Sequence, residues 1–394
     1  MKVLVASHTY IVDLNCEKLR ELSCLRSDIE VMAVVPQRWR PGGVQNKIIE
    51  PQAKQEDNFS LVPVPNFSEN NQGLLTFKSQ IINLLKKFQP DIIQVEQGAK
   101  SLLYAQLITV NKLLGLKAKN IFFTWWNLPY ANKFPISLLE AYNLKNTHGL
   151  IAGNQDGADI LLEHGYKGKT IIMPQLGVDE KLFSPQPRSE LAAKFNIKTD
   201  DFLVGFVGRF VPEKGILTLI KALTQLKHLS WKLLLLGRGE LKETIQETAT
   251  EAGIEDRLIM IESVPHDAVS RYINLMNVLL LPSETTYKFK TLTAAGWKEQ
   301  FGHVLIEAMA CGVAVIGSDS GEIPNVIEDA GLIFPEGNVE ALKDCLQKLI
   351  KDPELTNRLA QKGRDRAMKL YTNKALAEQQ LAFYEKLLSN LSSG

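Results

Sequence analysis

The residues whose types and spacing most clearly suggest a binding or catalytic site are two carboxylates that flank a glycine turn. Glu299 and Glu307 stand on either side of Gly302, and an apolar, helix-like run begins there. Glu307 is the only charged residue in that run, and an ionised carboxylate among apolar neighbours is costly unless partners satisfy it. The adjacent hydroxyls of a ribose could both donate to it, while the helix N-terminus would suit a phosphate. Glu299 would then face the group attached to that phosphate. The alternative is that Glu307 is a surface glutamate on an amphipathic helix.

A second cluster carries two cations directly after a predicted strand. The strand ends at Gly208, Arg209 follows in a turn, and Pro212 occupies a favoured first position of a helix that includes Lys214. Arg209 offers a planar fork of donors, whereas Lys214 is a compact point charge. Together they suit a diphosphate, whose departing charge the lysine would neutralise. The alternative is that both are solvated cations on a turn, but the two clusters together would address a single anion.

Composition restricts the class of protein that positions these residues. The 394 residues are too many for one ordinary core and fit two domains of roughly 150 to 200 residues. The hydrophobic share of 45% and charged share of 23% are those of a soluble globular protein. A formal net charge of +1 gives no electrostatic reason to expect nucleic acid as the main partner.

Cysteine spacing and hydropathy bear on the compartment. The four cysteines form no C-x-x-C pair, so they indicate reduced core thiols in a cytoplasmic protein, without a disulfide framework or a zinc site: Cys16, Cys24, Cys311 and Cys345. The apolar run at 3–6 is too short for a signal peptide, and no later run approaches the ~20 residues of a membrane span.

Short β-branched runs alternate with longer helical patterns, which indicates parallel sheets built from βαβ units. The predicted strands are 3–6, 29–35, 91–95, 120–124, 149–152, 170–173, 202–207, 232–236, 258–261, 278–281, 313–316 and 332–334. Predicted helices include 74–88, 100–114 and 214–226, with a helical tail from about 352. Residues 38–46 are predicted to be an exposed loop. Prolines and a glycine interrupt both periodicities at 174–187, so the domain linker is placed there.

The two clusters, with a third motif, resemble a known family. The motifs are Gly208-Arg209-x-x-x-x-Lys214-Gly215, Glu299-Gln-Phe-Gly302-x-x-x-x-Glu307-Ala-Met-Ala-x-Gly312 and Ser318-x-x-Gly321-Glu322-Ile323-Pro324. Together they resemble the retaining glycosyltransferases of family 4, strongly over roughly 200–335 and more weakly over the first domain. The resemblance implies a GT-B fold, in which two Rossmann-like, doubly wound parallel-sheet domains face a central cleft. It implies an acceptor-binding domain at 1–180, a donor-binding domain at 181–371 and a final helix at about 372–394 that returns to the first domain.

The same resemblance implies an activity, the transfer of a sugar from a nucleotide-diphosphate-sugar to a hydroxyl acceptor with the anomeric configuration kept. Arg209 and Lys214 would contact the diphosphate, Glu307 the ribose and Glu299 the hydroxyls of the donor sugar. Backbone amides near Gly302, His303 and Val304 would meet the phosphates, and Gly208 and Phe301 complete the donor-binding set. The family-level acceptor is a saccharide or lipid-linked saccharide of polysaccharide or glycolipid synthesis, which would place the protein at the inner face of the membrane.

The sequence also departs from the family pattern. Residues 7–10 lack the glycine pair that many members have after the first strand, and the stretch 123–127 lacks their histidine near the reacting carbon. His8 could stand in for that histidine, or it could bond to nearby backbone. Glu96 could hold an acceptor hydroxyl, or it could be a loop carboxylate in water. Of Trp125 and Trp126, one would be core and the other could lie against a sugar ring near Asn127, if the strand continues through both.

Several alternatives stay open at this point. No Asp-x-Asp pair occurs, so no dedicated metal site or other cofactor is expected, and the two cations could do a metal's electrostatic work. A GT-B module that binds a nucleotide sugar without turnover is the main alternative, and the missing histidine and glycine pair are its only support. The intact second-domain motifs count against it, and front-face transfer does not itself require that histidine. A nicotinamide-dependent oxidoreductase fits poorly, because residues 7–10 after the first strand lack G-x-G-x-x-G and the third glycine is also missing after Gly237-Arg238-Gly239. Residues 283–296 are either a loop that orders on donor binding or a surface excursion. Ser320 and Asn154 are predicted to cap helices.

Overall fold

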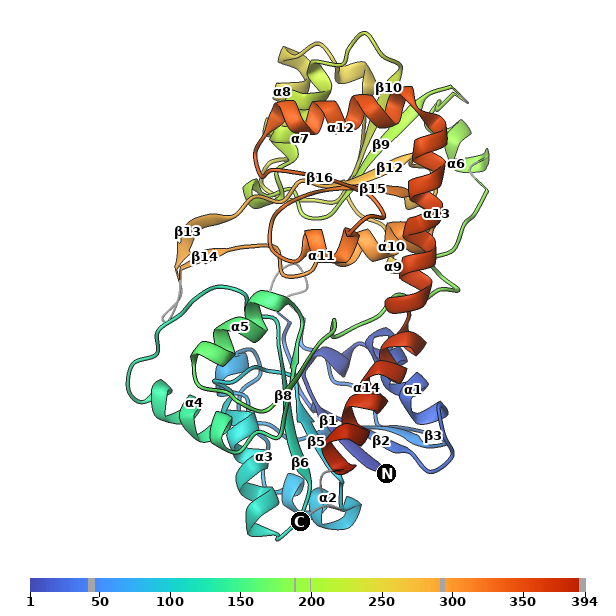
Figure 1. The fold of residues 1–394 in the computed structure, drawn as a ribbon. Coiled ribbons are helices and arrows are strands. Elements are labelled where there is room, and N and C mark those ends of the chain that lie inside the picture. Colours follow the sequence, from blue (N-terminus) through green and yellow to red (C-terminus); the bar gives the residue numbers. More distant parts are fainter. Residues whose placement is uncertain (42–46, 188, 199, 291–294, 390–394) are drawn as a thin grey trace. The chain divides into compact units, whose positions relative to one another are not determined.

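Residues from both ends of the chain meet in the first of two structural units. The structure, a computed structural model, describes residues 1–41, 47–187, 189–198, 200–290 and 295–389 (Figure 1). Unit 1 comprises Met1–Gly177 and Asn373–Gly394, and unit 2 comprises Val178–Thr372. The sequence-based boundary stood at 180/181. The glycines at 42 and 43 of the predicted loop and the polar tail at 392–394 lie outside the described residues.

Unit 1 is built on an eight-stranded sheet with the order β3-β4-β2-β1-β5-β6-β7-β8. Its strands are β1 (Lys2–Ala6), β2 (Glu30–Pro36), β3 (Lys54–Glu56), β4 (Phe59–Val64), β5 (Ile92–Val95), β6 (Lys119–Thr124), β7 (Gly149–Ala152) and β8 (Lys169–Ile172). Neighbouring strands are parallel except β3 and β4. The six predicted strands are confirmed to within two residues. The hairpin of β3 and β4 was missed, because β3 is fully polar and Pro63 interrupts the apolar pattern of β4.

The helices of unit 1 are α1 (Glu17–Cys24), α2 (Gln80–Phe88), α3 (Leu102–Leu113), α4 (Ile136–Lys145), α5 (Gln155–Glu163) and α14 (Asn373–Leu388), with 3-10 turns η1 (Thr9–Ile11), η2 (Asp13–Cys16) and η3 (Gln72–Leu74). The prediction of a helix over 74–88 is wrong in its first turns. The side-chain amide of Gln106 bonds both the N–H and the C=O of Phe77, at 2.9 and 2.6 Å, and so holds that segment extended. The predicted cap of α5 is confirmed, since the Asn154 side chain accepts from the Gly157 N–H at 2.7 Å.

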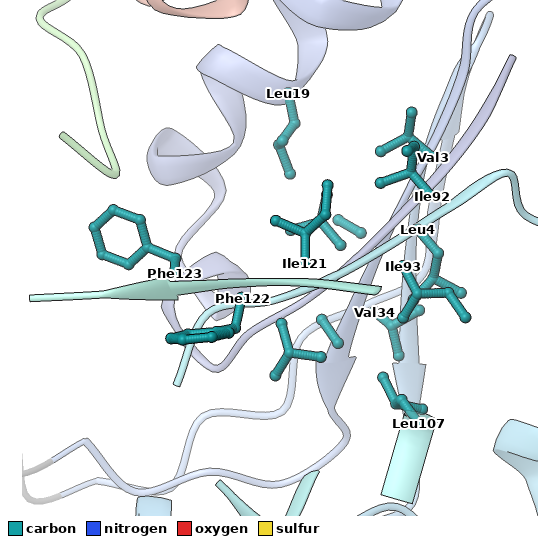
Figure 2. Packing of buried hydrophobic residues seen from close by; sticks show 14 of the residues in the cluster. Val3, Leu4, Leu19, Val34, Ile92, Ile93, Leu107, Ile121, Phe122 and Phe123 are labelled. Carbon is teal, nitrogen blue, oxygen red and sulfur yellow. The ribbon is translucent and has the colours of Figure 1, made fainter. Parts of the chain in front are cut away.

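The core of unit 1 covers both faces of this sheet. Successive residues of a strand point to opposite faces, and Figure 2 shows this for Ile92 and Ile93 and for Phe122 and Phe123. The final helix α14 packs beside α1 and closes part of the core (Figure 1). A Cβ on Gly149 of β7 would lie 2.6 Å from Leu387 of α14, so a side chain there would push the helix away.

Unit 2 contains a six-stranded, fully parallel sheet with the order β11-β10-β9-β12-β15-β16. The strands are β9 (Phe202–Val207), β10 (Trp231–Leu236), β11 (Leu258–Ile261), β12 (Val278–Leu281), β15 (Ala314–Ser318) and β16 (Leu332–Phe334). All six were predicted to within two residues. An additional antiparallel ribbon, β13 (Thr286–Lys290) and β14 (Ala295–Trp297), stands off this sheet (Figure 1). The expectation of an α/β fold with two parallel-sheet domains is thus confirmed.

The helices of unit 2 are α6 (Ser189–Lys194), α7 (Ile216–Thr224), α8 (Lys242–Glu251), α9 (His266–Ile273), α10 (His303–Ala310), α11 (Ile323–Ile327), α12 (Val339–Lys351) and α13 (Pro353–Leu370), with 3-10 turns η4 (Pro212–Lys214) and η5 (Glu255–Arg257). The helix expected from Pro212 is instead a 3-10 turn, which Gly215 at φ +64° separates from α7. Ser320 was predicted to cap a helix, but α11 starts after Glu322 and has no side-chain cap.

Two smaller expectations also need correction. Trp39 lies in the segment predicted as an exposed loop, yet it is only 2% exposed and pairs with Ile49 in an isolated β-bridge. An indole of that size is stabilised by removal from water. The four cysteines are free thiols, but Cys24 is exposed and therefore no core residue, whereas Cys16 and Cys311 are buried.

Strand order in both sheets identifies where a ligand would be met. In unit 2 the chain leaves β9 toward β10 and β11 and then returns to the other side of β9 with β12. In unit 1 the same reversal separates β1 from β5. Ligands of open α/β sheets bind beyond the carboxyl ends of the strands at such a reversal. The residues that follow β9 and β12, and those that follow β1 and β5, are therefore the candidates for contact with a ligand.

Candidate functional site

The turn after β9 is shaped by a glycine that no other residue can replace without strain. A Cβ on Gly215 would lie 1.8 Å from the carbonyl oxygen of Pro282, which directly follows β12, and the φ of +64° is unfavourable for any side chain. The turn η4 therefore packs closely against the end of β12. This contact brings Lys214, the last residue of η4, to the side of the residues that follow β12.

Lys214 and Glu299 form the centre of the candidate site. The Lys214 Nζ lies 2.5 Å from Glu299 Oε2, and the two side chains are only 15% and 9% exposed. Ser283 donates its hydroxyl to the same Glu299 oxygen at 2.7 Å. The ammonium also lies 4.8 Å from the ring centroid of Trp297, a distance at which an aromatic face attracts a cation. Since an ammonium has three donors, Glu299 holds Lys214 in place and leaves it able to donate to an anion.

Arg209 lies on the same turn but has a different partner. The Arg209 side chain is 63% exposed, its guanidinium lies 3.7 Å from Glu213 Oε1, and the Glu213 side chain is itself buried. The backbone C=O of Glu213 accepts from the Glu284 N–H at 2.9 Å, which ties the turn to the loop after β12. Arg209 is therefore an accessible cation on a fixed turn, and its side chain can rotate toward an anion.

The second predicted motif opens α10. Gly302 has a φ of +84°, and a Cβ there would lie 2.7 Å from Leu281 of β12, so the turn needs glycine. The helix begins at His303, whose Nδ1 lies 3.4 Å from Glu307 Oε1, and Val304 is half-buried. Phe301, 6% exposed, packs edge-on against Tyr371. The Glu307 side chain is 13% exposed, so it keeps some contact with solvent, and its carboxylate lies against the His303 imidazole.

These groups gather at the carboxyl edge of three neighbouring strands. Gly208 and Lys214 follow β9, Ser283 follows β12, and Ser320 follows β15 and lies 3.5 Å from the Glu299 N–H. The structure thus brings Lys214 and Glu299 into contact, whereas Arg209 and Glu307 are each paired elsewhere. A cation, a carboxylate and a helix N-terminus that share one strand edge can bind a phosphorylated ligand.

Sequence reasoning missed three contributors to this cluster. Ser283 and Ser320 bond Glu299, and Trp297 contacts Lys214. The two serines follow the ends of correctly predicted strands, so the strand-end rule would have found them if it had been applied to serine. Trp297 could not be found in that way, because it lies on β14, a strand that was not predicted.

The residues that follow β1 in unit 1 line a separate cleft of about 690 Å³, which includes His8, Asn15, Trp39 and Asn71. His8 Nε2 accepts from the amide of Gln72 at 2.8 Å, so its proton is on Nδ1. This Nδ1 is buried and has no hydrogen-bond partner among the residues that the structure describes. Burial lowers the pKa of His8 to about 4 because the charged form would lose its hydration. Within the described part of the chain, neither ring nitrogen bonds nearby backbone, contrary to the alternative raised from the sequence.

Glu96 does not behave as either of its sequence-based interpretations. It is 4% exposed, and its carboxylate accepts from Tyr10 at 2.9 Å, from Gln94 at 2.9 Å and from Gln175 at 2.7 Å. Both oxygens are thus used inside unit 1, and the burial and the carboxylate raise the pKa of Tyr10. The expectation of a carboxylate accessible to an acceptor, or of one in water, is corrected to a buried structural group.

The two adjacent tryptophans lie beyond β6, which ends at Thr124. The premise that the strand continues through them is therefore wrong. Trp125 donates from Nε1 to Gln175 at 3.0 Å, whereas Trp126 donates to the Leu128 carbonyl at 2.5 Å. Lys100 lies 5.1 Å from the Trp126 ring centroid, and Asn127 is 5% exposed. Trp126 is half-buried and keeps a partly accessible face, whereas Asn127 has little surface to offer.

Solved structures share this arrangement of strands and helices across nearly the whole chain. Sucrose-phosphate synthase from Thermosynechococcus elongatus is similar with a TM-score of 0.70 at 20% identity, over 99% of this chain and 100% of that one. The fold is GT-B. Anabaena HepE, solved in complex with UDP, is similar with a TM-score of 0.69 at 17% identity, over 99% and 100% of the two chains. At such identity the likeness of this GT-B chain concerns the fold alone.

Sequence comparison places the similarity chiefly in unit 2. Residues 187–366 match the family model described as glycosyl transferases group 1, and this segment contains every predicted donor-side residue. The N-acetyl-alpha-D-glucosaminyl L-malate synthase of Bacillus anthracis is 27% identical over 55% of this chain and 54% of its own length. The chain spans about half the length of the curated relatives it matches. None of the helices described in this GT-B structure is long and apolar enough to cross a membrane.

Proposed function

We propose that this chain is a retaining glycosyltransferase, which moves a hexosyl group from a nucleotide-diphosphate-sugar to a hydroxyl acceptor. The observation that supports it most is the Lys214–Glu299–Ser283 cluster at the carboxyl edge of β9 and β12, next to the N-terminus of α10. The match of residues 187–366 to the glycosyl transferases group 1 supports the same reaction class.

Each donor-side residue then has a defined task. Lys214 neutralises the charge that grows on the departing diphosphate. Arg209 turns from the surface and donates hydrogen bonds to the diphosphate oxygens. Glu299 orients the ammonium and accepts from hydroxyls of the donor sugar. Glu307 accepts from the ribose hydroxyls, and the first amides of α10, at His303 and Val304, bind phosphate oxygens.

The transfer itself needs little covalent chemistry from the protein. The bond between the anomeric carbon and the diphosphate oxygen breaks, and the acceptor oxygen forms its bond on the same face of the sugar. The acceptor proton goes to the departing phosphate oxygen. The protein positions both substrates and stabilises the leaving charge. The family's usual first-domain histidine is not required for this sequence of events, and Lys214 with Arg209 supplies positive charge without a dedicated metal. We therefore expect turnover without added metal.

The acceptor and the location belong to the same proposal. We propose a saccharide or lipid-linked saccharide acceptor in polysaccharide or glycolipid synthesis, met in the cytoplasm at the inner face of the membrane. A similar fold in complex with UDP makes UDP-sugars the first donors to try.

Replacement of Lys214 tests the proposal. Lys214→Ala should lower the rate of nucleotide release from a UDP-, GDP- or ADP-sugar by about a hundredfold, the size expected for the loss of a charge stabiliser. Lys221→Ala, an exposed lysine on α7, is the matched control and should keep the full rate. Near-normal rates in both Lys214→Ala and Arg209→Ala would contradict the assignment.

Two further outcomes separate the alternatives. Thermal stabilisation by a nucleotide sugar without any nucleotide release, with water or saccharides as acceptor, would favour a binding module without turnover. A β-linked product from an α-linked donor, seen by NMR of the anomeric proton, would contradict retention of configuration.

A further inference from the structure

Both ends of the ribbon formed by β13 and β14 lie beside the Lys214–Glu299 cluster. Its first strand begins three residues after Ser283, which bonds Glu299, and its second strand ends at Trp297, which contacts the Lys214 ammonium. Thr285, directly before the ribbon, is anchored by Glu336, which accepts from its N–H at 2.5 Å and from its hydroxyl at 2.7 Å. The base of the ribbon is therefore fixed to the candidate site.

The pairing of the two strands of this ribbon is irregular. Thr286 is paired with Trp297 and Lys290 with Ala295, so three residues of β13 stand opposite the single residue Gly296 of β14. Gly296 has a φ of +109°, which tolerates this mismatch. Bulges of this kind are frequent beside active sites, where they change the direction of a side chain. The residues within the bulge are Tyr287, Lys288 and Phe289.

The bulge exposes two aromatic rings. Tyr287 is 69% exposed and Phe289 is 49% exposed, and the lysine between them is exposed as well. Large aromatic side chains are normally removed from water, so neighbouring exposed rings mark a surface that a partner covers. The surface is small and mixed, with a hydroxyl, an ammonium and two ring faces within a few residues. A lipid surface would call for a broader apolar face and several cations.

We propose that the bulge of β13 is a saccharide-binding platform on which the acceptor chain rests while its terminal hydroxyl meets the Lys214–Glu299 cluster. A pyranose presents an apolar face of C–H groups that lies against an aromatic ring, and its hydroxyls bond the polar groups between the rings. Tyr287 and Phe289 supply the rings, and Lys288 supplies a donor to ring or hydroxyl oxygens. Trp297 at the base links the platform to the leaving-group cation. The acceptor role rests on the proposed function, whereas saccharide binding by the ribbon does not.

Titration of defined oligosaccharides tests the platform. Cellohexaose, maltohexaose and mannohexaose are titrated into the full-length chain by calorimetry, without nucleotide. At least one should bind, and the double variant Tyr287→Ala/Phe289→Ala should bind it at least about tenfold more weakly, since a lost aromatic contact is of that size. The ring-preserving pair Tyr287→Phe/Phe289→Tyr should bind as the wild type does. Phe134→Ala, which removes an exposed phenyl ring from unit 1, is the control.

Other results would contradict the saccharide-binding platform. Absence of binding by all three oligosaccharides, or equal binding by the double alanine variant, would overturn the platform. A loss of sedimentation with phosphatidylglycerol vesicles in that variant, without loss of saccharide binding, would assign the rings to a membrane. A change in oligomeric state would assign them to a second copy of the chain.

The two proposals can fail separately. Lys214→Ala should lower nucleotide release far more than it weakens oligosaccharide binding, because the rings of the platform remain. If the wild type binds an oligosaccharide through Tyr287 and Phe289 but releases nucleotide from no donor, the proposed function fails and the saccharide platform stands.

Discussion

The Lys214 ammonium sits between a carboxylate and an indole, and this placement depends on backbone geometry a residue away. Gly215 allows the turn η4 to approach the end of β12, because a hydrogen replaces the side chain that would meet the Pro282 carbonyl. Glu299 then comes within 2.5 Å of the ammonium, with Ser283 on the same oxygen. At the scale of single residues, the site is specified by a glycine as much as by its charges.

A substitution at Gly215 should therefore reduce stability sharply. We expect Gly215→Ala to lower the free energy of unfolding by about 3 kcal/mol or more, from left-handed strain together with a backbone clash. Gly253→Ala is the matched control, since its φ is +60° but its nearest neighbour is the flexible end of Lys227 at 3.8 Å. It should lose only about 1 kcal/mol. Equal losses in urea unfolding would show that the contact with Pro282 is unimportant.

The buried imidazole of His8 makes unit 1 sensitive to acid. Its pKa is about 4 in the folded chain against an ordinary 6.5, so between these values the unfolded chain binds more protons than the folded one. Stability is therefore unaffected above pH 6.5 and falls as the pH drops toward 4, by about 3 kcal/mol in total. His8→Gln should lack this part of the loss. Parallel stability curves for wild type and variant between these pH values would contradict the prediction.

At the scale of elements, α14 is the piece that completes unit 1. Leu376 and Tyr384 are fully buried, and the Tyr384 hydroxyl donates to Gln94 of β5 at 2.7 Å. Gln94 in turn bonds Glu96, so the helix is linked through β5 to the buried network after that strand. A helix from the far end of the chain thus stabilises the sheet that carries His8.

Truncation of one α14 side chain should reveal this dependence. Phe383 is 5% exposed against β7, and Phe383→Ala should cost about 3 to 4 kcal/mol through the cavity that it leaves. Glu378→Ala, on an exposed position of the same helix, should change stability by less than about 0.5 kcal/mol. Hydrogen exchange should localise the loss to the strands of unit 1. A loss spread equally over unit 2 would contradict this assignment.

At the scale of the whole molecule, the two units differ in how the chain builds them. Unit 2 is one continuous segment, Val178–Thr372, with its own apolar core around β9 and β12. Unit 1 needs both ends of the chain, because α14 supplies part of its core. We therefore expect unit 2 to fold by itself. We expect that residues 1–177, without α14, do not.

Expression of the separate segments tests this asymmetry. The fragment 178–372 should unfold in one cooperative transition and should be stabilised by the nucleotide that stabilises the full chain. The fragment 1–177 should lack a cooperative transition, because the faces of β7 and α1 that α14 covers would be exposed to water. Restoration by adding 373–394 through a flexible linker is the control. Failure of 178–372 to fold would show that unit 1 is required for its stability.

The sequence alone was enough for the strands and for the two charged motifs. Buried parallel strands are short apolar runs between turn residues, so all six strands of unit 2 were predictable from local pattern. Glu307 stood out because its charge conflicts with its apolar neighbours, and Lys214 because it follows a strand end together with Arg209. Sequence periodicity gave the wrong secondary structure where contacts with distant residues set the backbone conformation. Gln106 keeps Phe77 extended, and the polar strand β3 exists only through its pairing with β4.

Tertiary structure alone decided which groups act together. Glu96 and His8 both follow strands of unit 1, yet packing buried the first in hydrogen bonds and left the second in a cleft with an unsatisfied nitrogen. The contact between Lys214 and Glu299 joins residues 85 positions apart, and Trp297 reaches the ammonium from a ribbon that no local periodicity indicated. Local sequence determines the conformations that a segment prefers. The partner of a charge depends on which segments the fold brings to the same edge of a sheet, and that is a property of the assembled chain.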